Sequence, residues 1–557
     1  KQDLYMISRI QIPKIQGADE LFTEPYLNYL IHLHDKFSDQ IQILRKERLN
    51  NLQKAHEHGL ETLKLPISEI NTQDWHVDTV PEDLKQPGIE ISGPSSIASM
   101  MINALNPGPE GERAVGYLDD DEDSGGHSLQ DTINSAINRL SAINKSLEVV
   151  DSNRNRHYKL QPGNLPFFMH RERGLHLDEH EIKIDGSPIS ATLLGTSLTI
   201  FYCGQAQFKN NLGVYFYLPK LESVNEAKLY KQIFDESKKF LNLSESNIIK
   251  AIILVESLPA VFQMENMLHA LGKYGAGLNA ARWDLKASIL EFIMTNSNSV
   301  WPDRFDVDIK TTEFMSNIFR RLVAICLKHS AVAIGGMATA LPSSDDEINK
   351  IAANSIQSDK EWEAQQGFIR GWSAHIYHMK TASDPFKNLA KTGWTPSNEL
   401  KNPENFPIKI ETPTGKITSE GTRRNIRTII EYVEGWLNGR GAKGIDSLEG
   451  YPGKRPALME DLATARISVG QVAQRIIHSV TSEDTGDIHT MEYILSLIES
   501  ETEAILKIRK QESPNEFDSI QKNYIQSSKI TSNWIKNYTE LNFRSLGSYS
   551  KQQLLEM

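Results

Sequence analysis

Short apolar runs alternate with amphipathic stretches through the middle of the chain. The runs in RAVGYLDDDEDSGG, GVYFYLPKLES, KAIILVESLPA and SAVAIGGMATALP each pass directly into polar or glycine-rich residues, and helical stretches such as NEAKLYKQIFDESKKFL separate them. A repeated order of strand, polar loop and helix predicts a parallel α/β fold. In a parallel barrel the chemistry sits at the carboxyl ends of the strands, so the residues that follow these runs are candidates for a functional site.

The two ends of the chain have a helical pattern. Residues 1–88 are charged, and the apolar spacing in LFTEPYLNYLIHLHDKFSDQIQILRKERLNNLQKAHEHG predicts a long helix that ends near Gly59. Residues 89–410 carry the α/β pattern, with a β-rich insertion predicted at about 140–205, where the chain turns at Asp185-Gly186. Residues 411–557 are predicted to form a helical domain, and its first helix has an apolar stripe of Ile426, Ile429, Ile430, Val433, Trp436 and Leu437.

Composition narrows the class of protein. A net charge of −12 argues against nucleic acid as the main partner, because phosphate binding needs a basic surface. The two cysteines are too few for a disulfide framework and fit a reducing compartment, and we expect Cys203 to be a buried strand residue. No apolar run reaches roughly 18 residues, and the start lacks the apolar region of a signal peptide. We therefore expect a cytoplasmic enzyme that does not act on a membrane.

Acidic residues stand at three points where apolar runs end. Glu256 directly follows the run Ile252-Ile253-Leu254-Val255, Asp284 lies in GLNAARWDLKAS, and Glu460 and Asp461 lie in ALMEDLATARIS. Two carboxylates leave room for water and substrate around a divalent cation, and a third carboxylate can act as a base. A solvated strand end is the alternative interpretation of each carboxylate alone.

Two further charged segments leave both interpretations open. The run Asp119-Asp120-Asp121-Glu122-Asp123 is either a solvated loop or part of the same site, because it follows a predicted strand. Arg171 and Arg173 in MHRERGLHLDEHE offer planar donor groups for a carboxylate or an oxyanion, and a surface ion-pair segment is the alternative. The chain has no GxGxxG, GxxxxGK[ST] or GxSxG motif, so a nucleotide-binding fold or a hydrolase elbow is not supported.

Taken together, an ordered set of motifs resembles the malate synthases, and within them the shorter A-type enzymes. DDEDS (120–124) is similar to the family's acidic DFEDS motif, and RERGLHLDE is similar to its RxRGWHL segment. YFYLPKLES, VESLPAVFQME, GLNAARWD, IGGMA and LMEDLATARIS follow in the family's order. The resemblance covers residues from about 65 to about 475.

The resemblance implies a fold and a reaction. The fold is a TIM (β/α)8 barrel with an N-terminal helical segment, an inserted β-rich domain and a C-terminal helical domain that closes the site. The reaction is a Mg²⁺-dependent condensation of acetyl-CoA with glyoxylate and water to malate and CoA, in a monomer or small homo-oligomer. No CoA-binding signature is recognisable in the sequence.

The resemblance also implies roles for individual residues. Glu256 and Asp284 match the Mg²⁺ ligands, Arg173 the arginine that stabilises the enolate oxygen, and Asp461 the base. The turn around Ala281, Arg282, Trp283 and Asp284 matches the segment that holds glyoxylate, and Asp120 and Glu122 are supporting candidates.

The chain departs from the family pattern at several positions. Ala281 replaces a glycine, Leu285 and Ala287 replace aromatic residues, GFIRGWSAHI (367–376) has lost an Asp-Gly pair and a proline, and the link at 446–456 is long. These departures leave three alternatives open: a different 2-oxo acid or acyl-CoA, the reverse lyase chemistry of related barrels, or a catalytically degenerate homologue.

Overall fold

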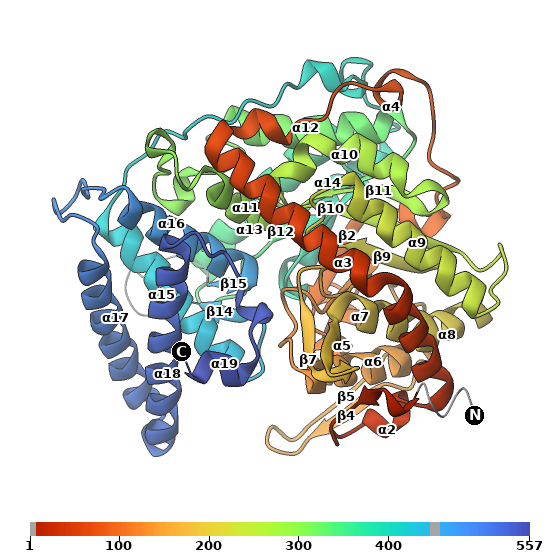
Figure 1. Ribbon diagram of the computed structural model, residues 1–557, viewed down its shortest axis with the longest axis horizontal. Coiled ribbons are helices and arrows are strands. Elements are labelled where there is room, and N and C mark those ends of the chain that lie inside the picture. Colours follow the sequence, from red (N-terminus) through yellow and green to blue (C-terminus); the bar gives the residue numbers. More distant parts are fainter. Residues whose placement is uncertain (1–6, 446–456, 557) are drawn as a thin grey trace.

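The computed structural model describes residues 7–445 and 457–556, so the long link at 446–456 lies outside the described residues. Its centre is a closed barrel of eight strands, in the spatial order β10-β11-β12-β13-β2-β3-β6-β9 (Figure 1). All neighbouring strands in this barrel run parallel. The strands are β2 (Gly88–Gly93), β3 (Gly116–Asp120), β6 (Phe167–Arg171), β9 (Val214–Leu218), β10 (Ile249–Val255), β11 (Gly275–Ala280), β12 (Val332–Ala338) and β13 (Arg370–Ser373). The predicted TIM barrel is confirmed.

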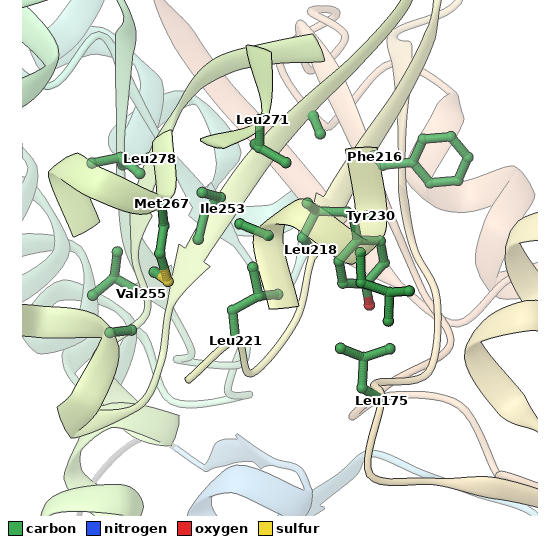
Figure 2. Close-up of a cluster of buried hydrophobic side chains, with 14 of the residues drawn as sticks. Leu175, Phe216, Leu218, Leu221, Tyr230, Ile253, Val255, Met267, Leu271 and Leu278 are labelled. Carbon is green, nitrogen blue, oxygen red and sulfur yellow. The ribbon is translucent and has the colours of Figure 1, made fainter. Parts of the chain in front are cut away.

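Strand β10 shows why its sequence is apolar without interruption. Ile253 and Val255 face the outer layer, where they pack with Leu218, Leu278 and the helix residue Met267 (Figure 2). Their neighbours Ile252 and Leu254 face the barrel interior. A strand that is buried on both faces has no solvent side, so the apolar run continues until the strand ends. The helices α9 (Val224–Phe240) and α10 (Leu258–Ala270) follow β9 and β10 and cover them from outside.

The predicted β-rich insertion at about 140–205 needs a correction. The range holds the hairpin β4–β5 (Glu148–Asp151 and Arg156–Lys159) and the hairpin β7–β8 (Asp178–Ile184 and Ser187–Ser190), but between them lies β6, a strand of the barrel itself. The turn at Asp185-Gly186 is correct, since both residues have positive φ, 52° and 84°. Cys203 is buried but belongs to a π-helix, Thr199–Gly204, and not to a strand.

The long N-terminal helix α3 (Glu24–His58) packs along the outside of the barrel against α9 and ends at Gly59, as predicted (Figure 1). The C-terminal helices are α15 (Ser419–Leu437), α16 (Leu462–Ile477), α17 (Met491–Glu512) and α18 (Phe517–Thr539). An apolar cluster that includes Ile430, Val469 and Trp534 holds them together. Helix α16 also packs against the barrel helix α11 (Arg282–Ile293), and this contact carries the start of α16 to the carboxyl end of the barrel. None of the described helices is long and apolar enough to cross a membrane.

Candidate active site

Three buried carboxylates meet at the carboxyl end of the barrel. Glu256 directly follows β10, Asp284 lies in the first turn of α11, and Asp123 lies in the loop that follows β3. One oxygen from each lies within 4.8 Å of the other two, and all three side chains are buried. The structure therefore brings the predicted pair Glu256 and Asp284 together and adds Asp123. Carboxylate oxygens are the donors that Mg²⁺ and Ca²⁺ prefer, so this set fits a hard divalent cation.

Arg171, Lys220 and Arg466 contact these carboxylates, and the Arg466 Nη1 atom lies 3.2 Å from Asp284 Oδ1. The Arg171 Nη2 atom lies 2.5 Å from Glu256 Oε1, 2.9 Å from Asp123 Oδ2 and 3.2 Å from Asp284 Oδ2. The Lys220 Nζ atom lies 3.0 Å from Asp123 Oδ1 and 3.3 Å from Asp284 Oδ1. Arg171 is the last residue of β6 and Lys220 follows β9, so both come from the same end of the barrel as the acids.

Burial and charge divide the protons unequally within this centre. Burial, with the Asp284 charge, raises the pKa of Glu256 well above its usual range, although Arg171 opposes this. Burial also acts on Asp284, but the charges of Lys220 and Arg171 outweigh it and lower the pKa of that carboxyl. Asp284 therefore stays ionised beside its cations, whereas Glu256 favours the protonated form. A metal ion that binds would displace the proton of Glu256.

Arg173, which the resemblance made the enolate-stabilising residue, does not reach the carboxylates. Its Nη2 atom lies 2.9 Å from Glu179 Oε1, and its Nη1 atom donates to the His127 carbonyl oxygen at 3.2 Å. Arg173 stands two residues beyond the end of β6, whereas Arg171 is level with Asp120 in the register of the barrel. Arg171 therefore contacts the buried carboxylates, whereas Arg173 pairs with Glu179.

Asp461 comes from outside the barrel and faces the same cavity. It is the N-cap of α16, where Oδ1 accepts the backbone N–H groups of Ala463 at 3.0 Å and Thr464 at 3.3 Å. It lines one cavity with Arg171, Glu256, Asp284 and Trp372, among others. Burial, reinforced by the charges of Asp123, Asp284 and Asp120, raises the pKa of Asp461 well above its usual range. A carboxylate with a raised pKa is a stronger base than an exposed one.

The turn Ala281-Arg282-Trp283-Asp284 also lines this cavity. Ala281 has φ −95°, which suits any residue, so its backbone conformation does not require glycine. The Arg282 guanidinium turns away from the carboxylates towards Asp308, 3.3 Å distant. Leu285 and Ala287, the two positions that depart from the family's aromatics, are buried in the apolar core. Neither is among the residues that line the cavity in the described part of the chain.

The acidic run 119–123 is buried throughout, so a solvated loop is the wrong interpretation. Asp120 stabilises its own loop, because its carboxylate accepts the backbone N–H groups of Glu122, Asp123 and Ser124 at 3.0, 3.2 and 3.2 Å. Glu122 accepts the backbone N–H of Gly174 at 2.5 Å and lies 3.0 Å from Lys220 Nζ. Asp119 and Asp121 pair with Arg139 on α6 (Leu129–Ile143). Asp120 and Glu122 thus support the site through the loop that carries Asp123.

Glu460 does not face the carboxylates. Its Oε2 atom accepts a hydrogen bond from Arg304 Nη2 at 3.1 Å, and the Arg304 guanidinium lies over the Trp283 ring at 5.2 Å. The residue before the candidate base is therefore tied to the turn that carries Asp284. The Glu460–Arg304 contact therefore joins β15, which directly precedes Asp461 and α16, to the barrel side of the site.

A closed parallel barrel, with a buried acidic centre at its carboxyl end and a helical domain that supplies one more acid, defines a TIM-barrel enzyme. Two family models match the chain, "Malate synthase, TIM barrel domain" over residues 167–410 and "Malate synthase, C-terminal" over residues 416–545. Malate synthase of Myxococcus xanthus is 33% identical over 473 residues, which is 84% of this chain and 83% of that protein.

Two further relatives give the same result. Malate synthase A of Escherichia coli is 33% identical and covers 83% of this chain and 86% of its own length. The glyoxysomal malate synthase of Candida tropicalis is 31% identical and covers 88% of each chain. The chain belongs to the malate synthase family.

Proposed function

We propose that this protein condenses acetyl-CoA with glyoxylate and water to give malate and CoA. The observation that carries the proposal is the meeting of Asp461, Arg171 and the carboxylates of Glu256 and Asp284 around one cavity. The barrel supplies two of the carboxylates and the cation, and the helical domain supplies the third carboxylate. A C–H bond beside a thioester is only weakly acidic, so its cleavage needs a base together with a cation that stabilises the new negative charge.

Asp461 acts as the base in this proposal. It removes a proton from the acetyl methyl group, and negative charge develops on the thioester oxygen. Arg171 stabilises that charge with its planar donor group, which suits an oxyanion better than a point charge does. The methyl carbon then forms a bond to the aldehyde carbon of glyoxylate, and the aldehyde oxygen becomes a hydroxyl. Water finally cleaves the thioester to release CoA.

Asp123, Glu256 and Asp284 would hold a Mg²⁺ ion, since their oxygens are buried and lie within 4.8 Å of one another. The chemistry that such an ion supplies when bound is polarisation of a carbonyl oxygen. Arg171 and Lys220 form ion pairs with these carboxylates and compensate part of their negative charge.

The turn at the start of α11 would bind the carboxylate of glyoxylate. The first N–H groups of an α-helix have no partner within the helix, and they attract anions. In α11 these groups belong to Arg282, Trp283 and Asp284, which line the cavity. The substrate's aldehyde group would then lie beside the carboxylate centre, with its acid group held by backbone donors.

Thiol release from acetyl-CoA tests the proposal. We expect release that needs both glyoxylate and Mg²⁺ and that yields malate. Release with pyruvate but not with glyoxylate would mean a different 2-oxo acid, and cleavage of malyl-CoA to glyoxylate without net thiol release would mean lyase chemistry. A folded protein that does neither would contradict an enzymatic function.

A further inference from the structure

The loop that carries Asp123 is joined to the C-terminal domain by a pair of side chains. The Trp436 Nε1–H group, near the end of α15, donates a hydrogen bond to His127 Nδ1 at 3.2 Å. The other ring nitrogen, Nε2, donates to the carbonyl oxygen of Glu122 in the acidic loop. Since Nδ1 accepts a hydrogen bond, the imidazole is neutral, and burial lowers the pKa of His127 in agreement with this. The ring therefore bridges the acidic loop and the C-terminal domain.

The backbones on the two sides are also in close contact. A Cβ atom on Gly441 would overlap the carbonyl oxygen of Gly125, so only glycine fits at position 441. His127 itself has φ +62°, a left-handed conformation that a histidine adopts only when its surroundings fix it. Ser124 on one side and Ala442 on the other line the cavity that contains Asp461. This contact, which we name the clasp (residues 124–127 with 436–442), thus closes one wall of the active site.

A short path leads from the clasp to Asp461. After α15 the chain enters β14 (Lys443–Ile445), which pairs antiparallel with β15 (Leu458–Glu460), and Lys443 is the register partner of Glu460. The Lys443 Nζ atom lies 2.8 Å from Glu431 and 2.5 Å from Glu434, which fixes β14 to α15. Asp461 directly follows Glu460.

We propose that His127 and Trp436 are positioning residues that set the place of Asp461 relative to the carboxylate centre. One end of the path holds Asp123 and the other holds Asp461, so a change at the clasp moves the base against the groups that stabilise the enolate. This role rests on the proposed function, in which Asp461 removes the methyl proton. A misplacement of about 1 Å in a catalytic constellation can cost up to about 10²-fold in rate.

The variants can separate this role from a simple loss of packing. Trp436→Phe keeps an aromatic ring and removes the N–H donor. His127→Gly keeps the left-handed conformation and removes the acceptor, whereas His127→Asn keeps both, because Asn Oδ1 takes the place of His Nδ1 and asparagine tolerates positive φ. Trp534→Phe is the matched control: Trp534 is buried in the same domain, and its Nε1 has no hydrogen-bond partner among the described residues.

The measurements are kcat, the KM for glyoxylate, and exchange of acetyl methyl protons with deuterated solvent. We expect Trp436→Phe and His127→Gly to lower kcat and exchange together by about 10-fold or more, with the KM for glyoxylate changed less than about 2-fold. The double variant should be no slower than the worse single variant, because both remove the same hydrogen bond. His127→Asn and Trp534→Phe should stay near the wild-type rate. Wild-type exchange in folded Trp436→Phe, or additive losses in the double variant, would overturn the proposal.

Amide hydrogen exchange tests the clasp without relying on activity. Peptides that cover residues 121–128 and 436–442 should both lose protection in Trp436→Phe and keep it in Trp534→Phe. Unchanged protection in Trp436→Phe would contradict the clasp even in an active enzyme. If the wild-type protein releases no thiol from acetyl-CoA, the proposed function fails, and this measurement still decides whether the clasp exists.

Discussion

Two of the buried clusters of charge in the barrel differ in balance. Deep in the barrel, Glu90 accepts a hydrogen bond from Arg370 Nε at 2.5 Å and from the Tyr217 hydroxyl at 2.7 Å. One carboxylate here meets one guanidinium, and Trp372 Nε1 donates to the same hydroxyl at 3.1 Å. At the carboxyl end of the barrel more carboxylates gather than cations: Asp120, Asp123, Glu256, Asp284 and Asp461 against Arg171, Lys220 and Arg466.

This difference in charge balance indicates which cluster stabilises the fold and which cluster binds ligands. In a balanced buried pair the charge is compensated by protein groups, and the pair holds neighbouring strands in register. A cluster with surplus carboxylates is incomplete by itself, so it retains affinity for a cation and for protons. The pKa values of Glu256 and Asp461 are raised by burial and by the neighbouring carboxylates. The comparison predicts that changes in the deep cluster act on stability, whereas changes at the carboxyl end act on metal binding and rate.

The largest effect on stability should come from the balanced cluster. Arg370→Met leaves Glu90 buried without its charged partner, which typically costs about 3–5 kcal/mol in the free energy of unfolding. Adding Glu90→Gln should recover part of that loss. Urea unfolding of the single and double variants measures both values. An Arg370→Met protein as stable as wild type would show that the deep cluster does not stabilise the barrel.

Turnover should depend most strongly on which arginine is changed. Arg171→Lys keeps the charge but loses the planar donor pair, and we expect kcat to fall by about 10²–10³-fold, the usual cost of one oxyanion donor. Arg173→Lys should lose far less, since Arg173 pairs with Glu179 away from the carboxylates. Steady-state kinetics of the two variants decide between them. A larger loss in Arg173→Lys would contradict the placement of Arg171 in the reaction.

Mg²⁺ should stabilise the wild-type protein and should lose this effect in Glu256→Gln. Binding at 100 times the dissociation constant adds about 2.7 kcal/mol to the free energy of unfolding. Arg370→Met should keep the full response, because its cluster holds no metal. Because Glu256 has a raised pKa, the ion must displace a proton, so apparent Mg²⁺ affinity should rise with pH. Thermal unfolding with and without Mg²⁺ at several pH values measures this, and equal responses in all three proteins would contradict it.

The smallest effect concerns Lys286, a buried lysine beside the Trp283 ring. Burial, opposed in part by Asp308, lowers its pKa to about 7. Below pH 7 the folded protein must bury the charge. Between pH 7 and the ordinary lysine pKa of about 10.4 only the unfolded chain is protonated, so stability rises across that range. Lys286→Met should therefore stabilise by about 1–2 kcal/mol at pH 6–7 and by progressively less towards pH 10. A gain that grows with pH would be the wrong sign.

Much of the fold followed from the sequence, because buried strands have unbroken apolar runs. Strand β6 falls inside the predicted insertion, and its apolar run is short, follows Pro166 and soon turns charged, so it lacks the unbroken pattern of β10. Glu256 and Asp284 were predictable as candidates, since Glu256 directly follows an apolar run and Asp284 lies in the turn after the next strand, β11. The same rule points to Arg171, the last residue of its strand, but the resemblance directed attention to Arg173.

Other features depend on contacts that one sequence does not reveal. The five consecutive acids 119–123 look equivalent in the sequence, yet only Asp123 joins the carboxylate triad, because the loop turns each side chain towards a different partner. Lys220 lies just beyond β9, and its contacts with Asp123 and Asp284 depend on the folded arrangement. The hydrogen bond between His127 and Trp436 joins residues 309 positions apart, and no local pattern predicts such a pair.

The most direct test of the account is the exchange of acetyl methyl protons with deuterated solvent in Asp461→Asn, followed by NMR. Asparagine caps a helix as well as aspartate does, so Oδ1 can still accept the N–H groups of Ala463 and Thr464 and α16 stays in place. The variant loses the negative charge of the carboxylate and with it the capacity to take a proton. The account predicts that Mg²⁺ and glyoxylate still bind while exchange and condensation both stop. Exchange at the wild-type rate in the folded variant would contradict the assignment of Asp461 as the base.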